Sequence, residues 1–212
     1  MTDTPVDTIE LKDRRFAVER AQVQGWLYDD ASGEICWSIN VRGMATRFGD
    51  GEFSQDLSPH FYDEAMPLRI DDWRKLEHSG YVFDLEGDDE GDSLPTLYLC
   101  SHLALPRSQL RFGVRRGHRF ALDWHGLAEA NWDEEFGRDL PFRIALDIEF
   151  TQQEVRFWHR HDDEDFEAAA RAVMARRGLS GEHLSYRDHR RFRDDPDDEH
   201  YRLIRAFFSP ID

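Results

Sequence analysis

The stretch FRIALDIEF (Phe142–Phe150) places apolar side chains at every second position, with charged or small residues between them. This period of two predicts a β-strand with one buried face. Apolar alternation or a β-rich composition, bounded by Gly, Pro and Asp, recurs in RFAVERAQVQGWLYDD, EICWSINVRG, TLYLCSHLAL, QLRFGV, HRFALDW and EVRFW. These short strands predict a mainly β (α+β) fold whose body is an antiparallel β-sandwich or barrel. A hairpin turn is predicted around Arg116 and Gly117.

An internal repeat organises these strands. RGMATRFGDGEFSQDL (Arg42–Leu57) aligns without a gap with HGLAEANWDEEFGRDL (His125–Leu140), and the identical pairs are Gly43 and Gly126, Ala45 and Ala128, Asp50 and Asp133, Glu52 and Glu135, Phe53 and Phe136, Asp56 and Asp139, and Leu57 and Leu140. Chance rarely gives so many identities in so short a window, so we predict a duplicated β-unit.

The alignment extends in both directions. Upstream, Ile39 and Val41 fall against Leu122 and Trp124. Downstream, if residues 58–66 are an insertion, residues 67–70 align with residues 141–144. We therefore expect a single composite domain over residues 1–212, in which a first β-unit (10–90) and a second β-unit (94–158) are followed by a C-terminal helical segment (162–212).

Two roles are open for the repeated residues. In the first, they form acidic partner-binding sites from Asp50, Glu52, Asp56, Asp133, Glu134, Glu135 and Asp139. In the second, which we favour for the repeat itself, the glycines permit turns of positive φ, Phe53 and Phe136 fill the core, and Asp56 and Asp139 cap turns. The acidic residues remain candidates for contacts with a partner.

The C-terminal region predicts two helices. Phe166, Ala169, Ala170, Val173 and Met174 form a helical stripe that ends before Gly178. Residues 178–200 are polar and predict a loop. Residues 194–208 predict a second helix with Asp195 as N-cap and Pro196 in its first turn. We expect both helices to pack on the β body or to join an oligomer interface.

The segment HRHDDED (His159–Asp165) could hold a metal, because His159, His161, Asp163 and Asp165 are ligand types for a divalent transition metal. The alternative is that residues 162–165 stabilise the N-terminus of the following helix. We favour the alternative, so neither a metal nor a cofactor is expected.

The formal net charge of −17 disfavours nucleic acid and anionic membranes as partners and attracts basic proteins. The acidic excess is not confined to one tail, so we expect it to spread over the folded body. The sequence contains no G-x-S-x-G, no P-loop and no G-x-G-x-x-G motif. It has neither an apolar run long enough to span a bilayer nor a signal peptide, so we expect a cytoplasmic protein.

The second repeat, FALDWHGLAEANWDEEFGRDLPFRIALDIEF (Phe120–Phe150), is similar to the β-strand patterns of immunity proteins of bacterial polymorphic toxin systems. That resemblance implies a cytoplasmic antitoxin, which would bind its cognate toxin and block the toxin's active site or its access to substrate.

Our first hypothesis is therefore a non-catalytic, acidic protein that binds a basic protein, such as a toxin domain. Two alternatives stay open. One is a metal-binding protein or metal-dependent hydrolase that uses His159 and His161. The other is a structural or regulatory β-sandwich that forms oligomers through its C-terminal helices.

Overall fold

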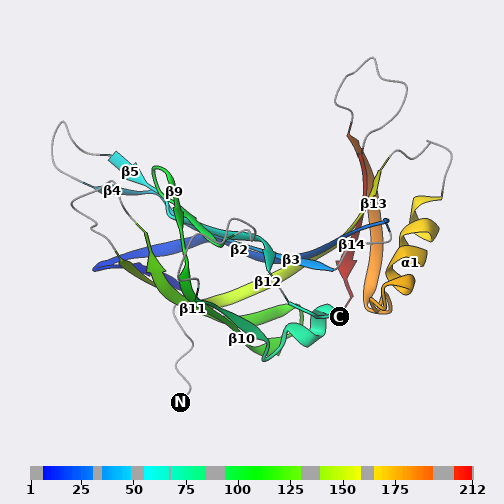
Figure 1. Cartoon of the computed structure of the whole chain (residues 1–212), viewed down its shortest axis with the longest axis horizontal. Coiled ribbons are helices and arrows are strands. Elements are labelled where there is room, and N and C mark those ends of the chain that lie inside the picture. Colours follow the sequence, from blue (N-terminus) through cyan, green and yellow to red (C-terminus); the bar gives the residue numbers. More distant parts are fainter. Residues whose placement is uncertain are drawn as a thin grey trace.

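The computed structural model (Figure 1) describes residues 7–30, 35–48, 55–66, 68–84, 94–129, 139–158, 165–192 and 203–211. Strands dominate these residues, which confirms the mainly β class. In chain order the elements are β1 (Thr8–Leu11), β2 (Arg14–Tyr28), β3 (Cys36–Gly43), β4 (Thr46–Phe48), β5 (Gln55–Leu57), β6 (His60–Met66), the 3₁₀ helix η2 (Trp73–Leu76), β7 (Gly80–Asp84), β8 (Thr96–Tyr98), β9 (His102–Ala104), β10 (Arg107–Arg116), β11 (Arg119–Ala128), β12 (Leu140–Trp158), the helix α1 (Phe166–Arg176), β13 (Leu184–Phe192) and β14 (Leu203–Pro210).

The nineteen-residue strand β12 joins two halves of one twelve-stranded sheet. Its first half pairs with β11 on one edge, up to Glu149, and with β1 on the other edge. Its second half pairs in parallel with β2 and, from Gln153 onward, in antiparallel with β14. One half of the sheet is therefore β7-β10-β11-β12-β1-β2, and the other is β13-β14-β12-β2-β3-β6-β8-β9.

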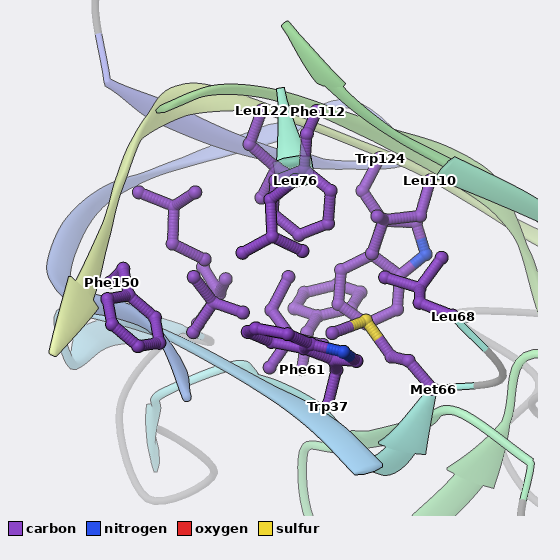
Figure 2. Close-up of a cluster of buried hydrophobic side chains, with 14 of the residues drawn as sticks. Trp37, Phe61, Met66, Leu68, Leu76, Leu110, Phe112, Leu122, Trp124 and Phe150 are labelled. Atoms are coloured by element: carbon purple, nitrogen blue, oxygen red, sulfur yellow. The ribbon is translucent and has the colours of Figure 1, made fainter. Parts of the chain in front are cut away.

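The sheet curls so that one face encloses the core. Phe61 on β6 packs 5.8 Å from Trp124 on β11 and 5.0 Å from Phe142 on β12, measured between ring centroids. Four strands separate β6 from β11 in the strand order, so these rings meet only because the sheet bends over itself. Figure 2 shows the apolar side chains enclosed between the two arms of the curl.

This architecture corrects the expected sandwich or barrel. The core lies inside one curled sheet rather than between two packed sheets, and the sheet does not close into a barrel. Strands from all three of the expected segments (10–90, 94–158 and 162–212) belong to the same sheet. The hairpin turn predicted at Arg116 and Gly117 is confirmed, with Gly117 at φ 62° between β10 and β11.

The opening of the curl is closed by side chains. The Trp73 ring of η2 stacks on Phe150 at 5.0 Å, so this short helix covers the core. In the described part of the chain, β7 and β6 are not paired through their backbones. Instead, the Tyr81 hydroxyl on β7 donates a hydrogen bond of 2.5 Å to Asp63 on β6, which also accepts one from the Ala65 amide.

The Asp63–Tyr81 pair is buried, and burial sets its ionisation. Asp63 is 1% exposed, and burial raises the pKa of its carboxyl above the usual range despite the two hydrogen bonds. Burial, together with the neighbouring Asp63, also raises the pKa of Tyr81. The two arms of the curl are therefore linked by a phenol that stays protonated.

The first C-terminal helix is confirmed as α1. Asp165 is its N-cap, and the side chain accepts a hydrogen bond of 3.1 Å from the Ala168 amide. Gly178 follows the helix with a φ of 71°, a conformation in which glycine commonly ends helices. The buried residues of the helix, Phe166, Ala170, Val173 and Met174, match the predicted stripe except for Ala169, which is half-buried.

The second C-terminal helix was predicted wrongly. Residues 203–210 form β14, and the segment expected as a loop contains β13. The apolar residues of β14 fit a helical stripe and a strand alternation equally well. The segment is a strand because its backbone pairs with both β12 and β13. Phe207 and Phe208 are buried within the chain, and the oligomer interface remains a prediction. Asp195 and Pro196 lie outside the described residues.

The duplication remains a prediction, but two details of it are wrong. Gly43 and Gly126 lie inside strands without positive φ. The downstream alignment also fails, because residues 58–66 contain β6 rather than an insertion, and residues 68–70 form a loop whereas residues 141–144 lie in β12. Phe53 and Phe136 lie outside the described residues.

The described ranges do not carry the acidic excess that was expected over the folded body. The described ranges contain as many arginines and lysines as aspartates and glutamates, so the remaining residues carry the whole net charge of −17. No helix in the described part of the chain is long and apolar enough to cross a membrane.

We expect Gly126→Ala to destabilise the protein by about 1–3 kcal/mol, because overpacking forces the backbone to shift. A Cβ at Gly126 would lie 2.3 Å from the Arg107 carbonyl oxygen and 2.7 Å from the Ser108 Cα, both in the backbone of β10. Urea unfolding measures the loss. Gly181→Ala is the control, because its Cβ would have neighbours no closer than 3.7 Å. Equal stability of the two variants would contradict the close approach of β10 and β11.

The raised pKa of Asp63 predicts a specific pH dependence. As pH rises above the usual aspartate pKa, the unfolded state releases its proton first, so the contribution of Asp63 to stability falls until the folded-state pKa is passed. Asp63→Asn should therefore lose less stability than the wild type as the pH rises above about 4. Tyr81→Phe should extend the fall to higher pH, because the lost hydrogen bond had lowered the pKa of Asp63.

Urea unfolding at several pH values tests this dependence. Asp84→Asn, at an exposed position on the same strand as Tyr81, is the control and should parallel the wild type. An Asp63→Asn profile that runs parallel to the wild type would show that Asp63 does not titrate in this way.

Candidate functional site

A groove lies on the sheet face opposite the core. Alternate residues of a strand face opposite sides, so Val23 and Leu27 on β2 enter the core while Gln24 and Trp26 face outward. The outward residues of β3, β6, β8 and β9 continue this face around a hollow of about 680 Å³, and they are Ser38, Asn40, His60, Tyr62, Tyr98 and His102. We call this part the β6 half of the outer groove.

The groove continues toward the C-terminal hairpin, which stands up from the sheet in Figure 1. A second hollow of about 310 Å³ shares Gln24, Trp26, Ser38, Arg156 and Arg205 with the first. Its other wall comes from β13 and β14, and comprises Arg187, Asp188, Arg190, Phe192 and Phe207. This is the β13 half, and the two halves together form the outer groove.

A carboxylate shared by two arginines lies at the centre of the groove. Glu154 on β12 is buried, and its Oε1 accepts a hydrogen bond of 2.8 Å from the Arg156 Nε. The Nε of Arg205 on β14 lies 3.3 Å from the same oxygen. Two guanidinium groups therefore face one carboxylate, which leaves the centre with a net positive charge.

Aromatic rings hold these arginines in place. The guanidinium carbon of Arg156 lies 4.1 Å from the centre of the Trp26 ring, and that of Arg205 lies 4.6 Å from the Phe192 ring. Arg190 lies 5.3 Å from the Phe207 ring. Cation–π contacts of this kind fix a long side chain without consuming its hydrogen-bond donors.

The far end of the β6 half is aromatic and polar. The rings of His60 and Tyr62 lie 5.0 Å apart, and those of Tyr98 and His102 lie 5.1 Å apart. Burial, reinforced by Arg42, lowers the pKa of His60, so its imidazole is neutral at pH 7. Tyr98 is 42% exposed and Phe192 is 40% exposed, so an accessible aromatic ring marks each end of the groove.

The predicted partner-binding residues lie elsewhere or outside the described residues. Asp56 is exposed on β5. Asp139 is exposed at φ 57° and forms an ion pair with Arg107 on β10. The other candidates, Asp50, Glu52, Asp133, Glu134 and Glu135, fall outside the described residues, so their role remains a prediction.

The metal hypothesis is equally untested. His159, His161 and Asp163 lie outside the described residues, and Asp165 caps α1, the role that the alternative assigned to this acidic run. Elsewhere in the described ranges, no group of three or more His, Cys, Asp or Glu side chains is placed to hold a metal ion.

The sequence patterns do not single out Trp26, Arg156 and Arg205. The alternation in QVQGWLY and QEVRFW carries part of the signal, because it places Trp26 and Arg156 on the faces opposite Leu27 and Val155. The parallel pairing that brings Trp26 beside Glu154 joins strands that are far apart in the chain, and no local pattern reveals it. Arg205 was missed because its segment was predicted as a helix.

Comparison with models of protein families, with curated proteins and with solved structures finds no match for this chain.

We expect Glu154→Gln to cost about 1–3 kcal/mol of folding free energy, because it leaves Arg156 and Arg205 without their shared carboxylate. Glu149→Gln is the matched control on the same strand. Glu149 forms exposed contacts with Arg119 and His118, and such pairs contribute at most about 1 kcal/mol. Chemical denaturation of both variants gives the comparison, and equal losses would mean that the central carboxylate has no special role.

Proposed function

We propose that this chain is a non-catalytic protein-binding protein that receives its partner in the outer groove, and that it serves as an immunity protein against a bacterial toxin. The observation that carries this proposal is the combination of accessible aromatic rings and arginines around one groove. Tryptophan, tyrosine and arginine are the side chains that most often dominate the energetics of protein interfaces. Trp26, Tyr62, Tyr98, Arg156 and Arg205 supply all three types.

The groove is also built to bind at low entropic cost. Its floor consists of strands paired in one sheet, and stacking already holds Arg156 and Arg205 over Trp26 and Phe192. Side chains that are ordered before binding lose little freedom when a partner arrives. This supports a protein that binds a partner as a preformed surface.

Charge favours a basic partner. The net charge of −17 belongs to residues outside the described body, and several of these acidic segments connect strands that border the groove. Residues 85–93 precede β8, and residues 193–202 join β13 to β14. Negative segments of this kind would accelerate the approach of a basic protein and make binding sensitive to salt. The earlier candidates Asp50, Glu52, Asp133, Glu134 and Glu135 belong to the same class of segment.

The first test is capture of a partner from the lysate of the native cells at low and at moderate salt. We expect the wild-type chain to retain a basic protein at low salt and to release it as salt increases. Tyr98→Ser and Phe192→Ser, at the two ends of the groove, should each lose the partner. Val114→Ser is the control, because Val114 is similarly exposed but lies on β10, outside the groove.

The second test addresses the immunity role. Expression of the captured partner alone should arrest growth, and co-expression of the wild-type chain or of Val114→Ser should restore it, whereas Tyr98→Ser and Phe192→Ser should not. A harmless partner would refute the immunity role. A partner captured equally by all variants would refute the groove as its binding site.

A further inference from the structure

We infer that the β13 half of the outer groove is a carboxylate-binding subsite, which receives an acidic side chain of the partner protein. This inference rests on the proposed function and specifies what the partner must present to the groove.

The local charge is positive. Arg156, Arg187, Arg190 and Arg205 line this half of the groove, against Glu154 and Asp188. Within the described residues, no carboxylate lies at ion-pair distance from Arg187 or Arg190. The four cations therefore exceed the two anions, in a hollow whose protein walls concentrate their field.

The arginines also keep donors available. Arg190 contacts the Phe207 ring, and Arg205 contacts the Phe192 ring, while the only carboxylate beside Arg205 in the described residues is the shared Glu154. A guanidinium group has five N–H donors, so one contact through Nε leaves the terminal nitrogens of Arg205 able to bind an anion. A carboxylate fits the paired N–H groups of arginine.

The net charge of the chain favours a single carboxylate over nucleic acid as the anion that binds in the β13 half. Nucleic acid carries a phosphate at every nucleotide, and the acidic excess of the whole chain repels such a polyanion at long range. A single carboxylate on a protein that is basic elsewhere meets no such barrier. The acidic segments would attract the partner as a whole, and the β13 half would then bind one of its acidic residues.

The arginines of β13 could instead serve only to protect an exposed strand edge, since charged side chains commonly prevent edge-to-edge association. In that case their removal would change the solubility of the protein and leave anion binding untouched. The two roles therefore predict different results for the same variants.

The test measures fluorescence anisotropy of a labelled peptide with a single glutamate and capped ends, titrated with the full chain, beside the same peptide with glutamine in its place and an oligothymidylate of similar length. We expect salt-sensitive binding of the glutamate peptide alone. Arg190→Gln and Arg205→Gln should each weaken it about tenfold, the effect of losing one charge-assisted hydrogen bond. Arg111→Gln, at an exposed position on β10, should bind as the wild type does. Because Arg205 contacts Glu154, thermal unfolding checks that its variant is folded, and Arg190 provides the variant without a carboxylate partner.

Absence of glutamate-peptide binding to the wild-type chain would overturn the inference, and so would binding that persists in both variants. Tighter binding of the oligothymidylate through the same arginines would replace the carboxylate with a nucleic-acid phosphate. These failures differ from failure of the proposed function, because capture of the basic partner and its dependence on Tyr98 and Phe192 would still stand.

Discussion

The strand β12 pairs with four other strands, whereas a strand that keeps the same partners along its length has at most two. The arrangement of the rest of the sheet follows from these four pairings. Over nineteen residues β12 pairs with β11 and β1, then with β2 and β14. One edge of β12 exchanges β11 for β14 between Glu149 and Gln153, and the other exchanges β1 for β2 between Ala145 and Glu149. A register shift between Phe150 and Gln152 interrupts the pairing with β2. Because β12 changes partners along its length, the strands beside it cannot all lie in one flat layer. The arm that contains β6 and the arm that contains β11 curl toward each other around the core, and the C-terminal hairpin stands up from the sheet (Figure 1).

The curl gives the two faces of the sheet different compositions, with apolar side chains inside and polar, charged and aromatic side chains outside. Phe61, Trp124 and Phe142 meet inside it, where aromatic rings contribute a large part of the buried apolar area. Because the core is satisfied by this one face, the opposite face can carry Trp26, Arg156 and the tyrosines without loss of packing. The described body is balanced in charge, and the acidic residues that make the chain anionic lie in the remaining segments. Long-range attraction and local contact can therefore reside in different parts of the same chain.

The parts of the fold that the sequence predicts correctly are those that depend on residues close together in the chain. The alternation around Phe142–Phe150, the turn at Gly117 and the capped helix after Asp165 are all local, and all three are confirmed. The expected sandwich or barrel and the expected second helix are wrong, and the groove was not foreseen, because each depends on which distant strands pair. In LIRAFF (Leu203–Phe208) the buried Ile204, Ala206 and Phe208 lie on one face of the strand, and Phe207 is buried on the face of the groove. The apolar residues therefore fit a helical stripe as well as a strand alternation. The preference for a strand comes from the hydrogen bonds of β12 and β13, which the sequence of this segment does not contain.

The groove and the partner exchange of β12 have a common origin. Glu154 and Arg156 lie just after the point where β12 exchanges β11 for β14, and that exchange brings Arg205 to within 3.3 Å of Glu154. The parallel pairing with β2 brings Trp26 opposite Glu154 and under Arg156. A buried carboxylate is costly unless cations compensate it, and here two guanidinium groups do so, each supported by an aromatic ring. The same arrangement that makes Glu154 tolerable leaves one positive charge in excess at the floor of the groove. Structural compensation at the junction of the two half-sheets thus produces the local charge from which a binding function can arise.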